Sequence, residues 1–162
     1  MKPAALMVAA LVLALPVHAS AVTTSPGKTS VAATETGALD AIGDMVPVTV
    51  TLAKGKPKQL LMINVAVSIG GDPSLPALYT IVTVNGTAVS HPGVQINQCN
   101  TASFQYCTIT TTNWVDIDAA ELAGPGLFVG QPLTIVVTGG NNISAGTGLG
   151  FTATVTATLV KK

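Results

Sequence analysis

The chain has 162 residues, of which 9% are charged: seven lysines, no arginine, and seven acids, for a formal net charge of zero. An ordinary soluble domain carries about 25% charged residues. No basic run is longer than the one formed by lysines 54, 56 and 58, so the electrostatic footprint of a nucleic-acid-binding protein is missing. The length fits one domain with a sizeable core.

Residues 1–19 have the pattern of a signal peptide. Lys2 supplies a positive start, residues 4–15 are apolar, and residues 17–19 end in the small-x-small motif that signal peptidase cleaves. The apolar run spans only about 18 Å as a helix, against roughly 30 Å of bilayer core. We therefore predict cleavage after Ala19, with Ala21 as the alternative, and a secreted, periplasmic or cell-surface protein without a membrane span.

The mature chain opens with a segment that has little to bury. Residues 20–40 are rich in serine, threonine and alanine, which predicts a flexible leader or a weak first strand before a β-sandwich domain at 41–162. Alternation of apolar and polar residues then predicts a half-buried strand at 46–52, and Pro47 suggests an edge position. Residues 59–69 are apolar on both faces and predict a central strand.

Turn and strand signals continue to the end of the chain. Asn85-Gly86 is a strong signal for a β-hairpin with a type I′ turn. Further strands are predicted at residues 78–84, 87–89, 106–117, 133–137 and 151–159. Asp118 and Glu121 fit a capping box, and Gly124-Pro125 supplies a stop, so one short connecting helix is expected.

Seven or eight strands with no βαβ rhythm predict an all-β fold. We expect a two-sheet antiparallel sandwich of the jelly-roll or Greek-key type, with the short helix as a connector. Threonines at 108–112 and 152–158 indicate exposed strand faces.

The two cysteines, Cys99 and Cys107, both lie in the mature chain. In an oxidising compartment they predict one disulfide that clamps a single loop. A redox function would favour a C-x-x-C pair, which the sequence lacks.

Candidate catalytic groups are sparse. His91 is the only histidine after the signal peptide, no Gly-x-Ser-x-Gly motif occurs, and the one local acid cluster is Asp116, Asp118 and Glu121. We interpret these residues as turn and capping residues, and we predict a protein that is not an enzyme and has no cofactor.

Calcium is the weaker alternative for the acids, because it binds carboxylate, amide and backbone oxygens on loops. Asp116 with Asp118 is one candidate pair. The other joins Asp72 with Asn141 and Asn142 at one end of the sandwich. Capping and turn formation is the interpretation that we favour for all of them.

Two aromatic residues suggest a glycan platform. By strict alternation Tyr106 and Trp114 point to the same side of one strand, with threonines between them, and the loop around Asn141 would complete the site. Alternatively, a bulge shifts the register and turns Trp114 into the core, which is the interpretation that we favour.

The leading hypothesis is a non-catalytic secreted β-sandwich that serves as a structural or adhesive module of the cell envelope or extracellular space. Its expected partners are further copies of itself or a cell-surface protein or glycan, and not nucleic acid. The alternative function is a carbohydrate-binding module that uses Tyr106, Trp114 and Asn141.

Overall fold

The alternating sequence pattern forms antiparallel strands in the computed structural model, which describes residues 19–25, 28–40, 43–70, 78–89, 107–118, 128–141 and 149–162. Nine strands occur in these ranges. They are β1 (Ala19–Ser25), β2 (Lys28–Ala38), β3 (Val48–Lys54), β4 (Gln59–Ile69), β5 (Leu78–Val84), β6 (Thr87–Ala88), β7 (Cys107–Asp116), β8 (Pro132–Asn141) and β9 (Gly150–Lys161).

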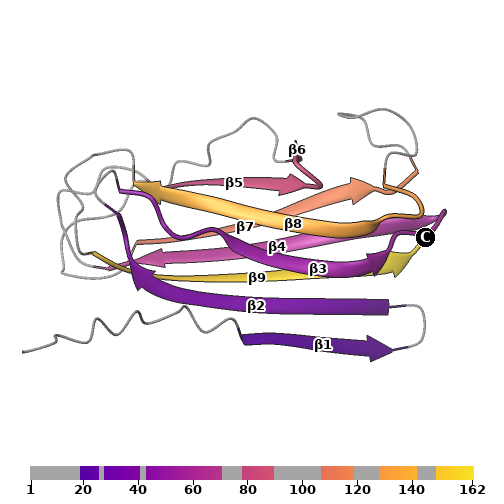
Figure 1. Ribbon diagram of the computed structural model, residues 1–162, viewed down its shortest axis with the longest axis horizontal. Coiled ribbons are helices and arrows are strands. Elements are labelled where there is room, and N and C mark those ends of the chain that lie inside the picture. Colours follow the sequence, from indigo (N-terminus) through magenta and orange to yellow (C-terminus); the bar gives the residue numbers. More distant parts are fainter. Residues whose placement is uncertain are drawn as a thin grey trace, which may run out of the picture.

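The strands form two stacked sheets (Figure 1). One sheet has five strands in the order β1-β2-β9-β4-β7, and the other has four in the order β3-β8-β5-β6. All paired strands run antiparallel. From β2 to β9 this is the strand order of a jelly roll, in which the chain passes repeatedly between the two sheets. The predicted all-β, two-sheet antiparallel sandwich is confirmed.

The core lies between the two sheets. On the central strand β4, every second side chain from Leu61 to Ile69 is fully buried, and on β8 the residues Leu133, Ile135 and Val137 are buried in the same way. Burial of one such side chain contributes about 1.5–3 kcal/mol. The apolar faces therefore supply most of the force that holds the sheets together.

The hairpin between β5 and β6 forms at the predicted turn. Asn85 and Gly86 have φ angles of 49° and 82°, the positive values that a type I′ turn requires. The Asn85 side chain also accepts a hydrogen bond from the Thr134 N–H (2.8 Å) and donates one to the Pro132 carbonyl oxygen (3.2 Å). The turn thus determines the strand pairing and also ties the hairpin to β8.

The segment predicted as a flexible leader or weak first strand carries two strands. β2 pairs with β9 along its whole length and buries Val31 and Ala33. β1 pairs with β2 at the margin of the sheet (Figure 1), and Val22 at its centre is 65% exposed. β2 is therefore part of the sandwich, whereas the central side chain of β1 contributes little to the core.

The predicted short helix is not borne out, since no helix occurs in the described ranges. Asp118, its expected N-cap, lies in a bend after β7, where its Oδ2 accepts a hydrogen bond from the Lys58 N–H at 2.7 Å. Its own N–H donates to Oδ1 of Asp116 at 2.9 Å. A side chain that bonds a distant backbone group does not cap a helix. The continuation through Glu121 lies outside the described residues.

A membrane-spanning helix is likewise not found in the described part of the chain, where no helix reaches the necessary length and apolar character.

Ile63 provides a test of the core. It is fully buried on β4, between β9 and β7, so Ile63→Ala should lower the free energy of unfolding by about 2–5 kcal/mol. Chemical denaturation measures the change, with Thr49→Ala on the exposed side of β3 as the control. A loss equal to that of the control would contradict the proposed packing.

Candidate functional site

The outer face of the five-stranded sheet carries hydroxyl and methyl groups and no charge over most of its area. On β2, β9, β4 and β7 the residues that alternate with those of the core align into rows across the sheet, and one of them, Thr158, is itself buried. We call these residues the threonine face: Thr36, Thr152, Ser68 and Thr108; Thr34, Thr154, Ala66 and Thr110; Ala32, Thr156, Asn64 and Thr112; Ser30, Thr158, Met62 and Trp114.

Cross-strand hydrogen bonds hold the side chains of this face in place. The hydroxyl oxygens of Ser30 and Thr158 are 2.9 Å apart, and those of Ser68 and Thr108 are 3.0 Å apart. A third pair, Thr34 and Thr154, is 3.1 Å apart. Because these contacts reduce rotamer freedom in the unbound protein, a ligand loses less affinity to side-chain ordering.

Trp114 lies on this face, near the edge of the sheet, and is 56% exposed. The register between β4 and β7 runs without a bulge from Leu60 to Ile69, so Trp114 points away from the core. The interpretation of Trp114 as a core aromatic is therefore wrong. Burial of Ile109 and Val115 on the opposite side of β7 leaves the indole exposed.

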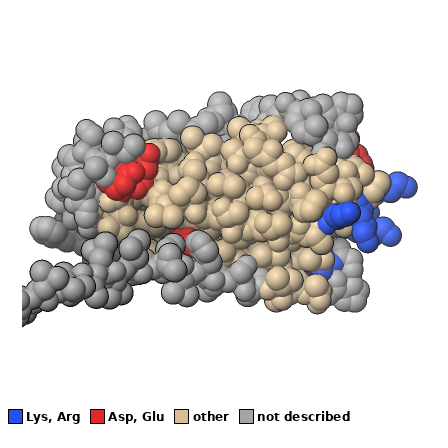
Figure 2. Space-filling model, viewed as in Figure 1, with Lys and Arg blue, Asp and Glu red and all other residues tan. Residues whose placement is uncertain are grey.

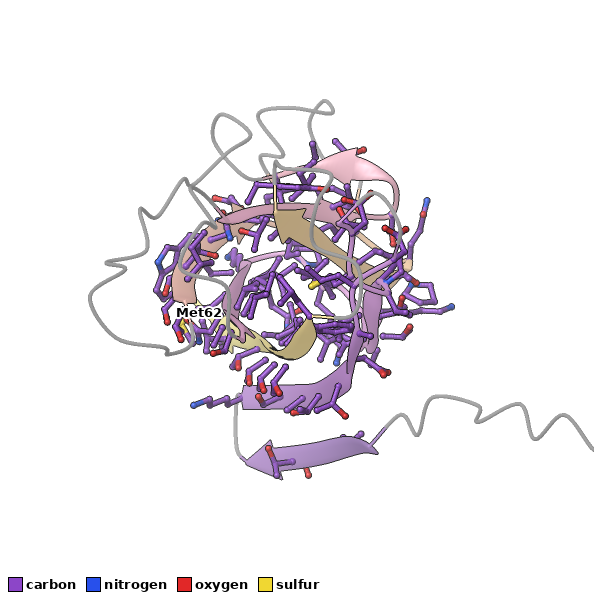
Figure 3. All side chains as sticks on the ribbon, turned by 90° about the vertical axis from the view of Figure 1, so that its left-hand side faces the viewer. Met62 is labelled. Carbon is purple, nitrogen blue, oxygen red and sulfur yellow. The ribbon has the colours of Figure 1, made fainter. Side chains whose placement is uncertain are left out.

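The neighbours of Trp114 come from β4. Met62 pairs directly with Trp114, and Figure 3 shows Met62 on the outside of the sandwich. In the next row, two residues further along β4, Asn64 pairs with Thr112. The Thr112 hydroxyl donates a hydrogen bond to Asn64 Oδ1 at 2.8 Å. An apolar patch thus lies beside hydrogen-bonding groups. Met62 and Asn64 were not among the predicted site residues, because most of the residues of β4 are apolar and predict a strand buried on both faces.

The other predicted members of the glycan site do not join Trp114. Asn141 ends β8 in the four-stranded sheet and pairs with Leu78, so it belongs to the other sheet. Its side chain is not described. Several further predicted residues lie outside the described ranges: Asp72, His91, Cys99, Tyr106, Glu121 and Asn142. Cys107 begins β7, and its disulfide with Cys99 stays a prediction.

Lysines gather at one end of the sandwich, where β2 and β4 begin and β3 and β9 end (Figure 2). We call this the basic end. Its lysines are exposed, and they are Lys28, Lys54, Lys56, Lys58, Lys161 and Lys162. Asp40 and Asp44 lie at the opposite end, where β2 and β8 finish and where Figure 2 shows acidic side chains.

The weak calcium candidates, Asp116 and Asp118, lie at the basic end and contact Lys162. Its ammonium group forms an ion pair with Asp116 and is 3.8 Å from Oδ2 of Asp118. Both carboxylates also accept backbone N–H groups. The described residues contain no group of three or more histidine, cysteine or acidic residues that could hold a metal ion.

At the acidic end, Tyr79 donates a hydrogen bond from its hydroxyl to Asp44 Oδ1. The Asp44 N–H donates to Asp40 Oδ1 at 2.9 Å. The segment around Asp44 approaches β8 closely, and a Cβ on Gly140 would collide with the Gly43 carbonyl oxygen. Burial, the hydrogen bond to Asp44 and the charges of both acids raise the pKa of Tyr79 to about 12. The contacts of Asp44 with Tyr79 and Gly140 thus hold the segment before β3 against the end of β8.

No protein-family model and no curated protein match the chain. Among solved structures, it is similar to a chain of the infectious bursal disease virus Gt strain, with 15% identity, a TM-score of 0.40 and 99% of this chain covered. It is also similar to a VP2 subviral particle of that virus, with 13% identity, a TM-score of 0.37 and 99% of this chain covered. A third similar structure is a family 35 carbohydrate-binding module from Clostridium thermocellum, with 10% identity and a TM-score of 0.34. The similarity covers 88% of this chain and 98% of that module.

The chain spans 38% and 37% of the length of the two viral chains.

Tyr79 predicts a specific loss of stability at high pH. The folded state holds the Tyr79 proton more tightly than the unfolded chain, whose tyrosine pKa is near 10, so this stabilisation is complete below about pH 10 and decreases towards pH 12. Tyr79→Phe should remove this decrease. At pH 7 it should also lower the free energy of unfolding by about 1.5–3 kcal/mol, because it deletes a hydrogen bond to a carboxylate.

Denaturant titrations at pH 7, 9 and 11 test both effects. The readout is the difference in the free energy of unfolding between the wild-type protein and the variant, so that effects common to both cancel. A difference that stays constant across these pH values would contradict the role assigned to Tyr79.

Proposed function

We propose that this chain is an exported, non-catalytic β-sandwich that acts by surface contact, as a structural or adhesive module. Export is supported by the signal-peptide pattern of residues 1–19. A non-catalytic role is supported by the engagement of the described surface acids in structural contacts: Asp40 and Asp44 around Tyr79, and Asp116 and Asp118 around Lys162.

The contact surface is the threonine face, and its ligand is a glycan. Exposure of Trp114 is the observation that carries this proposal. An exposed indole offers an apolar plane for a sugar ring, and Met62 extends it. The nearby Asn64 and Thr112 offer the donors and acceptors that match sugar hydroxyls. A face without charge imposes no ionic desolvation penalty on a neutral ring.

Self-association is the second candidate, because a flat uncharged face can also cover the same face of another copy. Size-exclusion chromatography with light scattering separates the two candidates. A monomer supports the glycan proposal, and an assembly that Trp114→Ala dissolves would replace it.

Trp114→Ala should weaken glycan binding about tenfold or more, equivalent to at least about 1.4 kcal/mol. A glycan array identifies ligands, and titration calorimetry with the best of them measures the change. Val46→Ala is the matched control, since Val46 is an exposed apolar residue (46%) on the segment before β3. Binding to no glycan at all, or equal affinity of the two variants, would remove the proposal.

A further inference from the structure

We infer that the glycan bound by the threonine face is anionic, with carboxylate or sulfate groups that the basic end attracts. This inference rests on the proposed function. It comes from the juxtaposition of the Trp114 patch with the lysines of the basic end, which are widely separated in the sequence.

The register places the two features side by side. The row with Trp114, Met62 and Thr158 is followed, towards the end of the sheet, by a row with Asp116, Leu60, Val160 and Lys28. Neighbouring rows on one face are roughly 7 Å apart, and the three strand spacings from β7 to β2 add up to roughly 14 Å. A chain of sugar rings that stacks on Trp114 and crosses diagonally from this row to the next therefore reaches Lys28.

Two further lysines lie beyond this row. The Lys162 N–H donates to the Lys58 carbonyl oxygen at 2.9 Å, which places the two residues next to each other at the end of β9. Lys162 pairs with Asp116, so the acid nearest to Trp114 on its own strand is neutralised. An anionic sugar over Trp114 thus meets little repulsion from that carboxylate.

The charge balance of the basic end favours an anion. Its six lysine side chains face two side-chain carboxylates among the described residues, those of Asp116 and Asp118, which leaves an excess of four positive side-chain charges. The opposite end carries Asp40 and Asp44. A molecule polarised in this way orients a negatively charged polymer towards the basic end and increases its rate of association.

The chain contains one tryptophan, so its fluorescence reports directly on the site. The full mature chain is titrated with polygalacturonate, dextran sulfate and neutral dextran at 50 mM and 500 mM NaCl. We expect at least one acidic polymer to bind about tenfold more tightly than the neutral one at low salt, and the preference to fall sharply at high salt because counterions screen the lysines. Comparison of the two acidic polymers distinguishes carboxylate from sulfate.

Lys28→Gln and Lys54→Gln form a matched pair of variants. Each removes one lysine from the basic end, but Lys28 lies next to the threonine face, whereas Lys54 pairs with Pro132 in the other sheet. Lys28→Gln should weaken acidic-polymer binding about threefold, and Lys54→Gln should weaken it less. Equal losses for the two variants would overturn the assigned path from Trp114 to Lys28.

Three other outcomes are decisive. Equal, salt-independent affinity for acidic and neutral polymers would overturn the inference and leave the proposed function intact. Binding to no glycan would overturn both. Equally tight binding to anionic phospholipid vesicles or to DNA, insensitive to Trp114→Ala, would replace the inference with a general affinity for polyanions.

Discussion

Burial of one side of each strand is the constraint on which the surface of this protein depends. Successive side chains of a strand point to opposite faces, so burial of Ile109 and Val115 commits Trp114 to the outside of the sheet. A shift of one residue would expose these apolar groups and bury a row of hydroxyls. The core therefore holds the register in place, and the threonine face follows from it.

The same arrangement separates charge from the contact face. Most of the charged residues that the structure describes are in turns and at strand ends, because the inner faces are apolar and the outer face of the large sheet is occupied by small polar side chains. Glu35, which is buried on β2, is the exception. At each end an acidic residue is held by a specific partner, Tyr79 for Asp44 and Lys162 for Asp116. The result is a neutral face bordered by polarised ends.

The strands were largely predictable from the sequence, and the candidate glycan site only in part. The alternation in β3 and β9 and the Asn85-Gly86 turn are local signals, and the structure confirms them. Asp118 was misassigned as a helix cap because its actual partner, Lys58, is 60 residues away in the chain. Met62 was missed for a similar reason, since only the pairing of β4 with β7 brings it to Trp114.

The alternation of apolar and polar residues is a property of contiguous residues, so the fold class and the position of most strands follow from the amino-acid sequence alone. The surfaces to which several strands contribute side chains have another origin. Lys28 begins β2 and Lys162 follows β9, so the two lysines are far apart in the sequence. The antiparallel pairing of β2 with β9 nevertheless brings both lysines to the same end of the sandwich. Long-range strand pairing, driven by burial of the apolar faces, decides which side chains meet, and this pairing has no local signature.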